Sequence, residues 1–419
     1  MSVSTLLTSG PEERTPTRSS VKPLSVITVH NRYLMRGGED EVFESEARLL
    51  QDRGCRVQAI SQEMTYPRGV AGKVRVAVNA VWSKPWHDDF SSTLSEIRPD
   101  VVHVHNFFPL ISPAIYYACR DAGVPVVQTL HNYRLLCPGA TFYRDGHVCE
   151  DCLVHGLERS VIHGCYRDSR LGTATAAVML KVHRQRNTWT EAVNRYIALT
   201  EFSRRKFIEG GLPADRIVVK PNFVLPDPGP GTGSRDYAIF VGRLVDLKGV
   251  PTMLAAWKRL SKPIPLVIAG DGPYRPQLEA ELAGKGLSAV QYRGRLSRPE
   301  TLAAIQGAKF LIFPSEWYEG FPVTIAESFA CGTPVIASRL GSMPDIVADG
   351  STGLHFEAGN ADDLAQKVEW AWSNGGEIET MSRAARAEFE ARYTADRNYE
   401  QLIDIYRAAI GSRNQPGGA

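Results

Sequence analysis

The stretch EGFPVTIAESFACGTPVIAS, residues 319–338, has two carboxylates eight positions apart, Glu319 and Glu327. Pro322 suits the first position of a helix, where its missing N–H loses no hydrogen bond, and Gly332 suits the residue just past a helix end. The sequence therefore predicts a helix that begins at about Pro322 and ends directly before Gly332.

The start of this helix has the properties of an anion site. Its free N–H groups and positive dipole end favour a phosphate, and Gly320 would let the backbone approach that phosphate closely. Glu319 and Glu327 are on the order of 10 Å apart along the axis, close to the span from a sugar ring through a diphosphate to a ribose. Each carboxylate could accept hydrogen bonds from a pair of hydroxyls. The alternative for Glu319 is a carboxylate that stabilises the helix dipole and binds no ligand. Glu327 lies among apolar and small residues, so its carboxylate needs hydrogen-bond donors.

Length and composition limit the function classes. The 419 residues are 43% hydrophobic and 22% charged, which suits two domains better than one core. Because 48 basic residues nearly balance 46 acidic ones, no global field attracts nucleic acid, and any anion site must be local. No stretch resembles a membrane span or a secretion signal, so we expect a cytoplasmic protein, at most attached to a membrane face.

From Leu24 onward, short apolar runs alternate with amphipathic stretches, a pattern typical of a parallel sheet covered on both faces. The runs of the first half are LSVITVH, CRVQAIS, VVHVHN, PVVQTLH, RYIALT and RIVVKPN, with a helix predicted over EVFESEARLLQDRG. After NFVLPDPGPGTGSRD, rich in Pro and Gly, the alternation restarts with YAIFVG, PLVIAGDG, VQYRGRL, KFLIFPS and PVIAS. We therefore predict an α/β fold of two facing doubly wound, Rossmann-like domains that share a cleft at the carboxyl ends of their strands.

The predicted organisation has six parts: a disordered leader (1–22), an N-terminal Rossmann-like domain (23–222) with a Cys-rich insertion (137–165), a linker (223–236), a C-terminal Rossmann-like domain (237–385), a helix that returns to the first domain (386–411) and a tail (412–419). The leader is rich in Ser, Thr and Pro and has no periodicity. Helical spacing over residues 381–393 and 391–410 supports the returning helix.

Glycines and cations follow the predicted strands of the second domain. They are Gly242, Arg243 and Lys248 in VGRLVDLKG, Gly270, Asp271 and Gly272 in IAGDGP, and Arg293, Gly294 and Arg295 in YRGRL. Arg243 and Lys248 are five positions apart in one loop, so a guanidinium and an ammonium could reach one diphosphate from two sides. An isolated pair would be solvated loop cations, and it is the neighbouring glycines and the predicted helix that favour a phosphate site.

These residues resemble the retaining nucleotide-sugar glycosyltransferases of family 4, which have two facing Rossmann-like domains, the GT-B architecture. The resemblance covers nearly the whole chain after the leader. It rests on RGGED, VGRLVDLKG, IAGDGP, the two glutamates eight apart, and FACGTPVIAS, in that order. It implies an enzyme that moves a sugar from a nucleoside diphosphate, such as a UDP- or GDP-sugar, to a glycan or lipid-linked acceptor in polysaccharide or glycolipid synthesis.

The resemblance also implies roles on the donor side. Arg243 and Lys248 would hold the diphosphate, Glu319 the hydroxyls of the donor sugar, and Glu327 the ribose. The remaining donor contacts would come from the backbone at Gly320, Phe321 and Pro322, from Gly242 and Gly270 to Gly272, and from Arg295 near the base.

In the first domain, Gly37 and Gly38 fall in the loop after the first strand, where the family brings backbone N–H groups to the donor; a simple tight turn is the alternative. His131 follows PVVQTLH, and the resemblance makes it the strand-end histidine beside the donor sugar. His105 and Asn106 end VVHVHN and are predicted acceptor contacts. Asp40 and Glu41 favour the helix start without a catalytic part, and Asp345 stands where many relatives have Glu.

The implied chemistry is front-face transfer with retention and without a metal, because no Asp-x-Asp motif for a sugar-diphosphate metal is found and the cations and helix end already supply positive charge. No cofactor is then needed besides the nucleotide-sugar substrate. Two alternatives stay open: a hydrolase or epimerase of the same fold, or a non-catalytic protein that binds a sugar nucleotide.

Four of the seven cysteines, Cys137, Cys149, Cys152 and Cys165, fall within 29 residues. A Cys-x2-Cys pair flanked by single cysteines resembles a structural zinc knuckle, and nearby histidines offer other ligands. Packing without metal is the alternative, since the outer spacings match no standard zinc finger.

Two segments mix Lys or Arg with Trp: KVRVAVNAVWSKPWHDDF and LKVHRQRNTWTEAVNRY. This composition suits either contact with a membrane surface or tryptophans that face the core.

Overall fold

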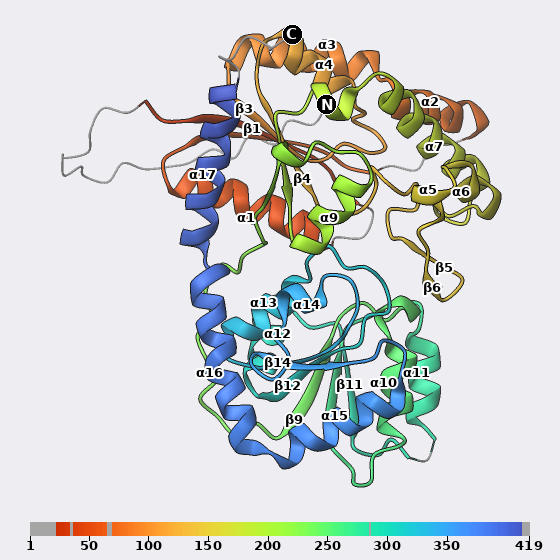
Figure 1. Cartoon of the computed structure of the whole chain (residues 1–419), viewed down its shortest axis with the longest axis vertical. Coiled ribbons are helices and arrows are strands. Elements are labelled where there is room, and N and C mark those ends of the chain that lie inside the picture. Colours follow the sequence, from red (N-terminus) through yellow and green to blue (C-terminus); the bar gives the residue numbers. More distant parts are fainter. Residues whose placement is uncertain (1–21, 34–36, 65–68, 285, 413–419) are drawn as a thin grey trace.

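The structure, a computed structural model, describes residues 22–33, 37–64, 69–284 and 286–412. The chain forms two α/β domains, one above the other in Figure 1, each built on a six-stranded parallel sheet. The fold class predicted from the alternation of strands and helices is confirmed. The proposed leader, except for its last residue, and the tail after residue 412 lie outside the described residues, as does Arg36 of the RGGED motif.

The first sheet has the strand order β2-β1-β3-β4-β7-β8, and every neighbouring pair is parallel. Its strands are β1 (Ser25–Asn31), β2 (Arg56–Gln62), β3 (Val101–Asn106), β4 (Val126–Leu130), β7 (Arg195–Ala198) and β8 (Ile217–Val219). Strands β1, β3 and β4 are buried along their whole length, as expected where helices cover both faces. The helices of this domain are α1 (Gly38–Asp52), α2 (Gly69–Val81), α3 (Lys84–Ile97), α4 (Ala114–Asp121), α7 (Arg170–Gln185), α8 (Thr188–Glu191), α9 (Glu201–Glu209) and η1 (Ala214–Arg216).

The Cys-rich insertion was predicted as a long loop, and the structure gives it short elements of its own. They are the antiparallel hairpin β5 (Tyr143–Arg144) and β6 (His147–Val148), followed by α5 (Asp151–Val154) and α6 (Glu158–His163). The insertion follows β4, the fourth strand along the chain.

The second sheet has the order β11-β10-β9-β12-β13-β14 and is again parallel throughout. Its strands are β9 (Tyr237–Val241), β10 (Leu266–Ala269), β11 (Val290–Gly294), β12 (Ala308–Phe313), β13 (Val335–Ser338) and β14 (Gly353–Phe356). The edge strand β14 was not predicted from the sequence. Its helices are η2 (Asp246–Lys248), α10 (Val250–Trp257), α11 (Arg275–Leu282), α12 (Arg298–Gln306), α13 (Val323–Ala330), α14 (Met343–Ile346), α15 (Ala361–Ser373) and α16 (Gly375–Arg392).

The last helix, α17 (Ala395–Ser412), returns to the first domain, as predicted (Figure 1). It contacts β3, β4, β7 and α1, while α16 packs on α13 of the second domain. The chain crosses between the domains twice, and the two crossings touch, because the Val224 N–H donates to the Tyr393 carbonyl at 3.0 Å. Helical spacing had suggested an unbroken overlap of the last two helices, but the chain leaves the helical conformation between Arg392 and Ala395.

The carboxyl ends of the two sheets meet at the boundary between the domains. His131 directly follows β4, and the loop after β12 brings Gly320 against it: a Cβ on Gly320 would lie 2.6 Å from the His131 carbonyl oxygen. The domains therefore face each other as predicted, and Gly320 and His131 of the predicted site lie at this boundary. Within the described ranges, none of the helices is both long and apolar enough to cross a bilayer.

Candidate active site

Helix α13 begins where the sequence predicted. Pro322 is its N-cap residue, with φ −75° and ψ 108°, and the helix ends one residue before Cys331. The side chain of Phe321 is buried and packs edge-on against Tyr393, at 5.5 Å between ring centroids. Tyr393 lies in the segment that crosses between the domains, so this contact fixes the residues that precede α13. The free N–H groups of the first turn of α13 therefore have a fixed direction.

Glu319 is buried, at 6% exposure, and its Oε1 atom accepts three hydrogen bonds. The donors are Lys248 Nζ at 2.5 Å, Ser315 Oγ at 2.6 Å and Trp317 Nε1 at 2.6 Å. The structure thus pairs the predicted sugar-binding acid directly with the predicted phosphate-binding lysine. Ser315 and Trp317 were not predicted, although PSEWYEG places them within four residues of Glu319.

Glu327 is buried as well, at 8% exposure, and it has the donor that its surroundings require. Arg298 Nη1 lies 3.2 Å from Glu327 Oε1 and also 3.2 Å from Oε2 of Glu41 in the first domain. Burial raises the pKa of Glu327, and the Arg298 guanidinium opposes that shift. Arg298 therefore joins the predicted ribose acid to the other domain, a link that the sequence did not indicate.

The packing of the loops after β9 and β10 requires glycine, whatever these residues bind. Gly270 has φ +149°, and a Cβ there would lie 1.8 Å from the Gly242 carbonyl oxygen. A Cβ on Gly272 would lie 2.4 Å from the carbonyl oxygen of Leu244, and the Gly272 N–H donates to Asp271 Oδ1. Backbone thus stacks on backbone at this sheet edge. Arg243 and Arg295, which flank these loops, are both exposed.

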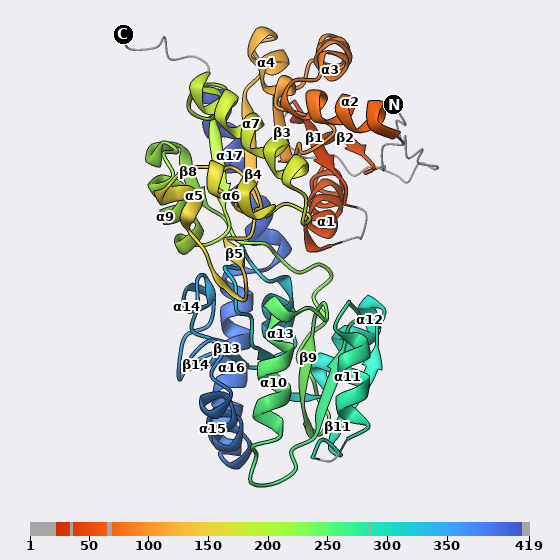
Figure 2. The ribbon, with the colours of Figure 1, turned by 90° about the vertical axis from the view of Figure 1, so that its right-hand side faces the viewer.

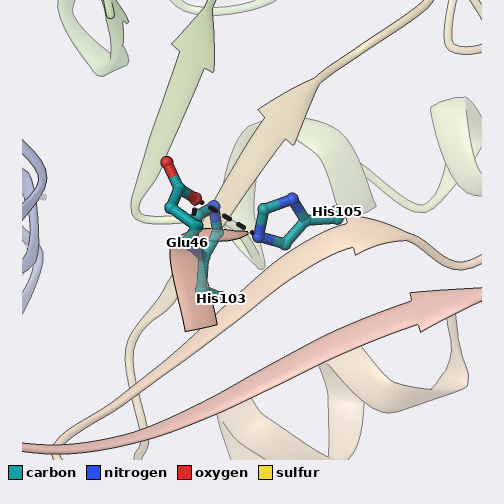
Figure 3. A group of neighbouring side chains, drawn as sticks. All are labelled: Glu46, His103 and His105. Carbon is teal, nitrogen blue, oxygen red and sulfur yellow. Dashed lines mark ion pairs between the residues drawn. The ribbon is translucent and has the colours of Figure 1, made fainter. Parts of the chain in front are cut away.

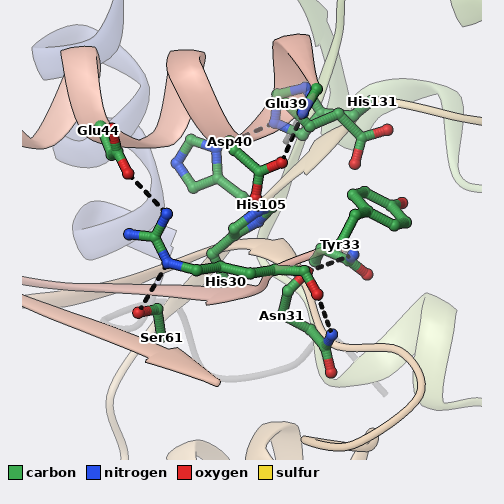
Figure 4. Close-up of polar contacts among 12 residues, drawn as sticks. His30, Asn31, Tyr33, Glu39, Asp40, Glu44, Ser61, His105 and His131 are labelled. Carbon is green, nitrogen blue, oxygen red and sulfur yellow. Dashed lines mark hydrogen bonds and ion pairs between the residues drawn. The ribbon is translucent and has the colours of Figure 1, made fainter. Parts of the chain in front are cut away.

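His131 is almost buried, at 9% exposure, and lies where β4 meets the second domain. Its Nε2 atom is 3.0 Å from Nδ1 of His105, and Figure 4 shows the two rings side by side. Burial lowers the pKa values of both rings well below the usual value for histidine. His131 is therefore a neutral group at the domain boundary.

The two residues predicted to contact the acceptor substrate, His105 and Asn106, have their contacts within the first domain. His105 is 3% exposed and lies behind His131. Asn106 Nδ2 donates to the Asn31 carbonyl at 2.9 Å, and its Oδ1 accepts from the Phe108 N–H at 3.0 Å. Asn106 therefore shapes the turn after β3.

The RGGED motif starts a helix, as predicted. The Gly37 N–H donates to Asp40 Oδ2 at 2.9 Å, and Asp40 Oδ1 lies 3.0 Å from Nε2 of His30 (Figure 4). Gly38 is the first residue of α1, and no other part of the described chain comes within 4 Å of a Cβ placed on either glycine. Both glycines thus lie at an open helix N-terminus.

Glu39, at the same helix start, was not predicted from the sequence. Its Oε1 accepts from Asn132 Nδ2 at 2.9 Å, next to His131, while Oε2 is buried and has no hydrogen-bond partner among the described residues. Burial raises the pKa of Glu39, opposed by the Asn132 bond. The feature of the sequence that could have indicated Glu39 is its position directly after the paired glycines of RGGED.

Behind His131 lies the group formed by Glu46, His103 and His105, whose ligand atoms all lie within 4.8 Å of one another (Figure 3). Lys220 Nζ lies 2.6 Å from Glu46 Oε1 and already supplies the positive charge. His103 has Tyr406 OH at Nδ1 and Thr129 Oγ1 at Nε2, each at 2.8 Å. Protein groups thus occupy both ring nitrogens of His103 and one oxygen of Glu46, and the Lys220 ammonium does not favour a metal ion at this point.

Asp345, the departure from the family pattern, contacts the first domain. Its Oδ2 accepts from the Phe202 N–H, in the first turn of α9, at 2.5 Å. This carboxylate therefore holds the two domains together.

The four clustered cysteines gather at the base of the insertion. Cys137 and Cys152 are buried and share a hydrogen bond, which lowers the pKa of the Cys137 thiol. A Cβ on Gly139 would lie 3.6 Å from Cys137 Sγ and 3.4 Å from Cys165 Cβ. Among the described residues, no three of these thiols approach one another as closely as the ligand atoms of the Glu46 group do.

Comparison with known proteins gives two matches that together span most of the chain. The sequence profile of the glycosyl transferases group 1 matches residues 230–388, and that of the glycosyl transferase 4-like domain matches residues 37–222. The chain belongs to the group 1 glycosyltransferases.

Two relatives and one solved structure illustrate the likeness. The uncharacterized glycosyltransferase MJ1178 of Methanocaldococcus jannaschii is 31% identical over 41% of this chain and 50% of its own length. The D-inositol 3-phosphate glycosyltransferase of Mycobacterium leprae is 28% identical over 74% of this chain and 70% of its own length. The crystal structure of Anabaena Alr3699/HepE in complex with UDP covers 92% of this chain and 100% of that chain, with a TM-score of 0.65 at 16% identity. This group 1 glycosyltransferase therefore has the GT-B fold.

Proposed function

We propose that this group 1 glycosyltransferase moves a sugar, with retention, from a nucleoside diphosphate to a hydroxyl of a glycan or lipid-linked acceptor. The observation that carries the proposal is the pair of Lys248 with the buried carboxylate of Glu319 before the start of α13, next to Gly320, which meets His131 of the first domain. A cation, an anion and free N–H groups at one point suit a ligand that combines phosphate charge with sugar hydroxyls. The complexes of Anabaena Alr3699/HepE with UDP and with UDP-glucose are in keeping with such a donor.

In this proposal, Lys248, Arg243 and the N-terminus of α13 bind the diphosphate. Glu319 accepts hydrogen bonds from the donor sugar, and Glu327, held by Arg298, accepts them from the ribose. Backbone groups at Gly37, Gly38 and residues 320–322 complete the phosphate and sugar contacts, and the strand ends at Gly242, Gly270–Gly272 and Arg295 border the base. His131 contacts the donor sugar from the first domain, and the hydroxyl that attacks enters on the side of His105 and Asn106.

The proposed reaction is a front-face displacement. The bond from the anomeric carbon to the diphosphate oxygen breaks while the acceptor oxygen forms a bond on the same face, and the acceptor proton passes to the departing diphosphate. Lys248, Arg243 and the helix end stabilise the charge that develops on the leaving group, so no metal or cofactor is assigned to the transfer. We place this reaction in the cytoplasm, where nucleotide sugars would be the substrates.

Incubation with a panel of UDP- and GDP-sugars, with and without crude glycan or lipid acceptor, tests this function. Transfer only in the presence of acceptor, with the product in the donor's anomeric configuration, is expected. Sugar release or a changed sugar without acceptor would favour the hydrolase or epimerase. Binding of a sugar nucleotide without any turnover would favour a non-catalytic protein.

We propose that Cys137, Cys149, Cys152 and Cys165 bind a structural zinc ion that has no part in the transfer. Binding would draw the thiols closer, since Zn–S bonds of about 2.3 Å place four sulfurs around one point. Protein purified without added zinc is expected to contain about one zinc per chain, and the variant Cys149→Ser/Cys152→Ser is expected to lose it. Cys55→Ser, outside the insertion, is the matched control; a zinc content near zero in the unmodified protein would contradict the site.

The first domain also offers a surface for the lipid-linked acceptor. Trp86 and Trp189 face the core, and Trp82, which is partly exposed, packs against His87 and Tyr117. Exposed apolar residues lie instead on α2, α5, α6 and α7, which share one side of the domain in Figure 2: Val70, Val74, Val78, Val154, Ile162, Leu171 and Val178. Neither α2 nor α7 contains an acidic residue. We propose that this surface contacts an anionic membrane face.

Co-sedimentation with vesicles of anionic lipid tests this contact. Binding at low salt that weakens at high salt is expected, and Val74→Asp/Val78→Asp should reduce it, because it places negative charge in the apolar stripe. Trp370→Asp, at an exposed apolar position on α15 of the other domain, is the matched control. Absence of binding at low salt would contradict the surface.

A further inference from the structure

Three histidines lie in a row, from the middle of β3 to the end of β4: His103, His105 and His131 (Figures 3 and 4). Burial lowers the pKa of His103 to about 4 and those of the other two well below the usual value. Each ring is therefore neutral near pH 7 and has one N–H and one lone pair. The nitrogen that holds the proton decides what each ring can bind.

His103 leaves this choice open. Both of its ring nitrogens face hydroxyls, those of Tyr406 and Thr129, and a hydroxyl can donate or accept. Either form of His103 is therefore satisfied, and this ring does not constrain its neighbours.

Glu46 does constrain them. Burial alone would raise its pKa, but the Lys220 ammonium, 2.6 Å from Oε1, together with His103 and Asn398 outweighs burial, and the net shift of the pKa is downward. A charged carboxylate can only accept hydrogen bonds. Its second oxygen, Oε2, lies 3.5 Å from Nε2 of His105, and neither atom has a hydrogen-bond partner elsewhere among the described residues.

We infer that Glu46 and His105 are positioning residues that fix the protonation of His131. His105 holds its proton on Nε2, facing the carboxylate, and accepts at Nδ1 from a proton on Nε2 of His131. The opposite arrangement would set the lone pair of His105 Nε2 against the carboxylate and leave both buried atoms without a partner. His131 then offers the unprotonated Nδ1, on the ring edge turned away from His105, as an acceptor.

This assignment gives His131 a defined chemical role, and it rests on the proposed contact of His131 with the donor sugar. An unprotonated nitrogen can bind only a donor such as a sugar hydroxyl, whereas a protonated one could also bind the ring oxygen or a carbonyl oxygen of the sugar. The chain from Lys220 through Glu46 and His105 therefore selects a hydroxyl-bearing position of the donor. It also makes residues remote from the substrate important for turnover.

Nuclear magnetic resonance of the full chain labelled with ¹⁵N-histidine reads the protonation directly. The nitrogen shifts of His105 and His131, assigned by single replacements, are expected to show protons on Nε2 in both rings near pH 7.5. In Glu46→Gln the amide can donate to His105 Nε2, and His131 is expected to move its proton to Nδ1. A proton on Nδ1 of His131 in the unmodified protein, or no change in Glu46→Gln, would overturn the inference.

Kinetics separate this inference from the proposed function. Glu46→Gln is expected to lower kcat about tenfold, the size of one lost hydrogen bond, with a smaller change in the KM for acceptor. His105→Asn is a second variant should Glu46→Gln fold poorly, and it should leave the proton of His131 unfixed. His103→Asn is the matched control, since it is equally buried but has no bond to His131, and it should keep kcat. A moved proton with unchanged kcat would overturn the positioning role and the sugar contact; the resonance result stands whether or not transfer is observed.

Discussion

Replacement of Lys248 by alanine is expected to lower kcat by about 10²- to 10³-fold, the effect of one lost charge-stabilising group in an active site. The ammonium lies within hydrogen-bond distance of Glu319 and above the ring of Trp317, 5.6 Å from its centroid. It is therefore held in one place before the donor arrives, and its charge needs no rearrangement as the diphosphate departs. Steady-state kinetics with the donor identified in the panel measure the loss.

Two further variants identify the cause of that loss. Lys258→Ala removes a cation that pairs with Glu281 at the surface of the same domain, and it should leave kcat unchanged. Lys248→Arg keeps the charge but not the compact ammonium, and it should recover part of the activity. If Lys248→Ala turned over donor at the unmodified rate, the assignment of the phosphate site would be wrong.

The sequence was informative where a residue type has a local reason. Pro322 and Gly332 mark the ends of α13 because caps are local rules, and Asp40 closes the N-terminus of α1 for the same reason. The central strands β1, β3 and β4 could be predicted because they are buried on both faces and read as apolar runs. The edge strand GLHF was missed because its run is short and contains a histidine.

Contacts between the domains could not be predicted, because they join residues far apart in the sequence. Arg298 reaches Glu327 and Glu41 only once the two sheets face each other. Asp345 stands where many relatives have Glu, and its bond from the Phe202 N–H forms only once a helix of the other domain lies beside it. The pairing of Lys248 with Glu319 also joins residues far apart in the sequence. Each was predicted for the site, but the bond between them forms only when the loops after β9 and β12 lie side by side.

Gly320→Ala is expected to lower kcat/KM by about 10²-fold, the loss that a misplacement of about 1 Å can cause in an active site. The new Cβ would lie 2.6 Å from the carbonyl oxygen of His131, a backbone atom that cannot rotate away. The domains must therefore separate at the point where the proposed donor sugar lies between Glu319 and His131. Because the change affects the meeting of the domains and not their cores, the melting temperature should fall by only a few degrees.

The matched control for this steric effect is Gly375→Ala, at the first residue of α16, where a Cβ meets nothing within 4 Å. It adds the same methyl group, and a helix tolerates alanine better than glycine, so activity should be kept and stability slightly raised. Full activity of Gly320→Ala would mean that catalysis does not require the contact between these two loops. The donor sugar would then have to bind elsewhere than between Glu319 and His131, because a site built from both domains cannot tolerate their separation at its centre.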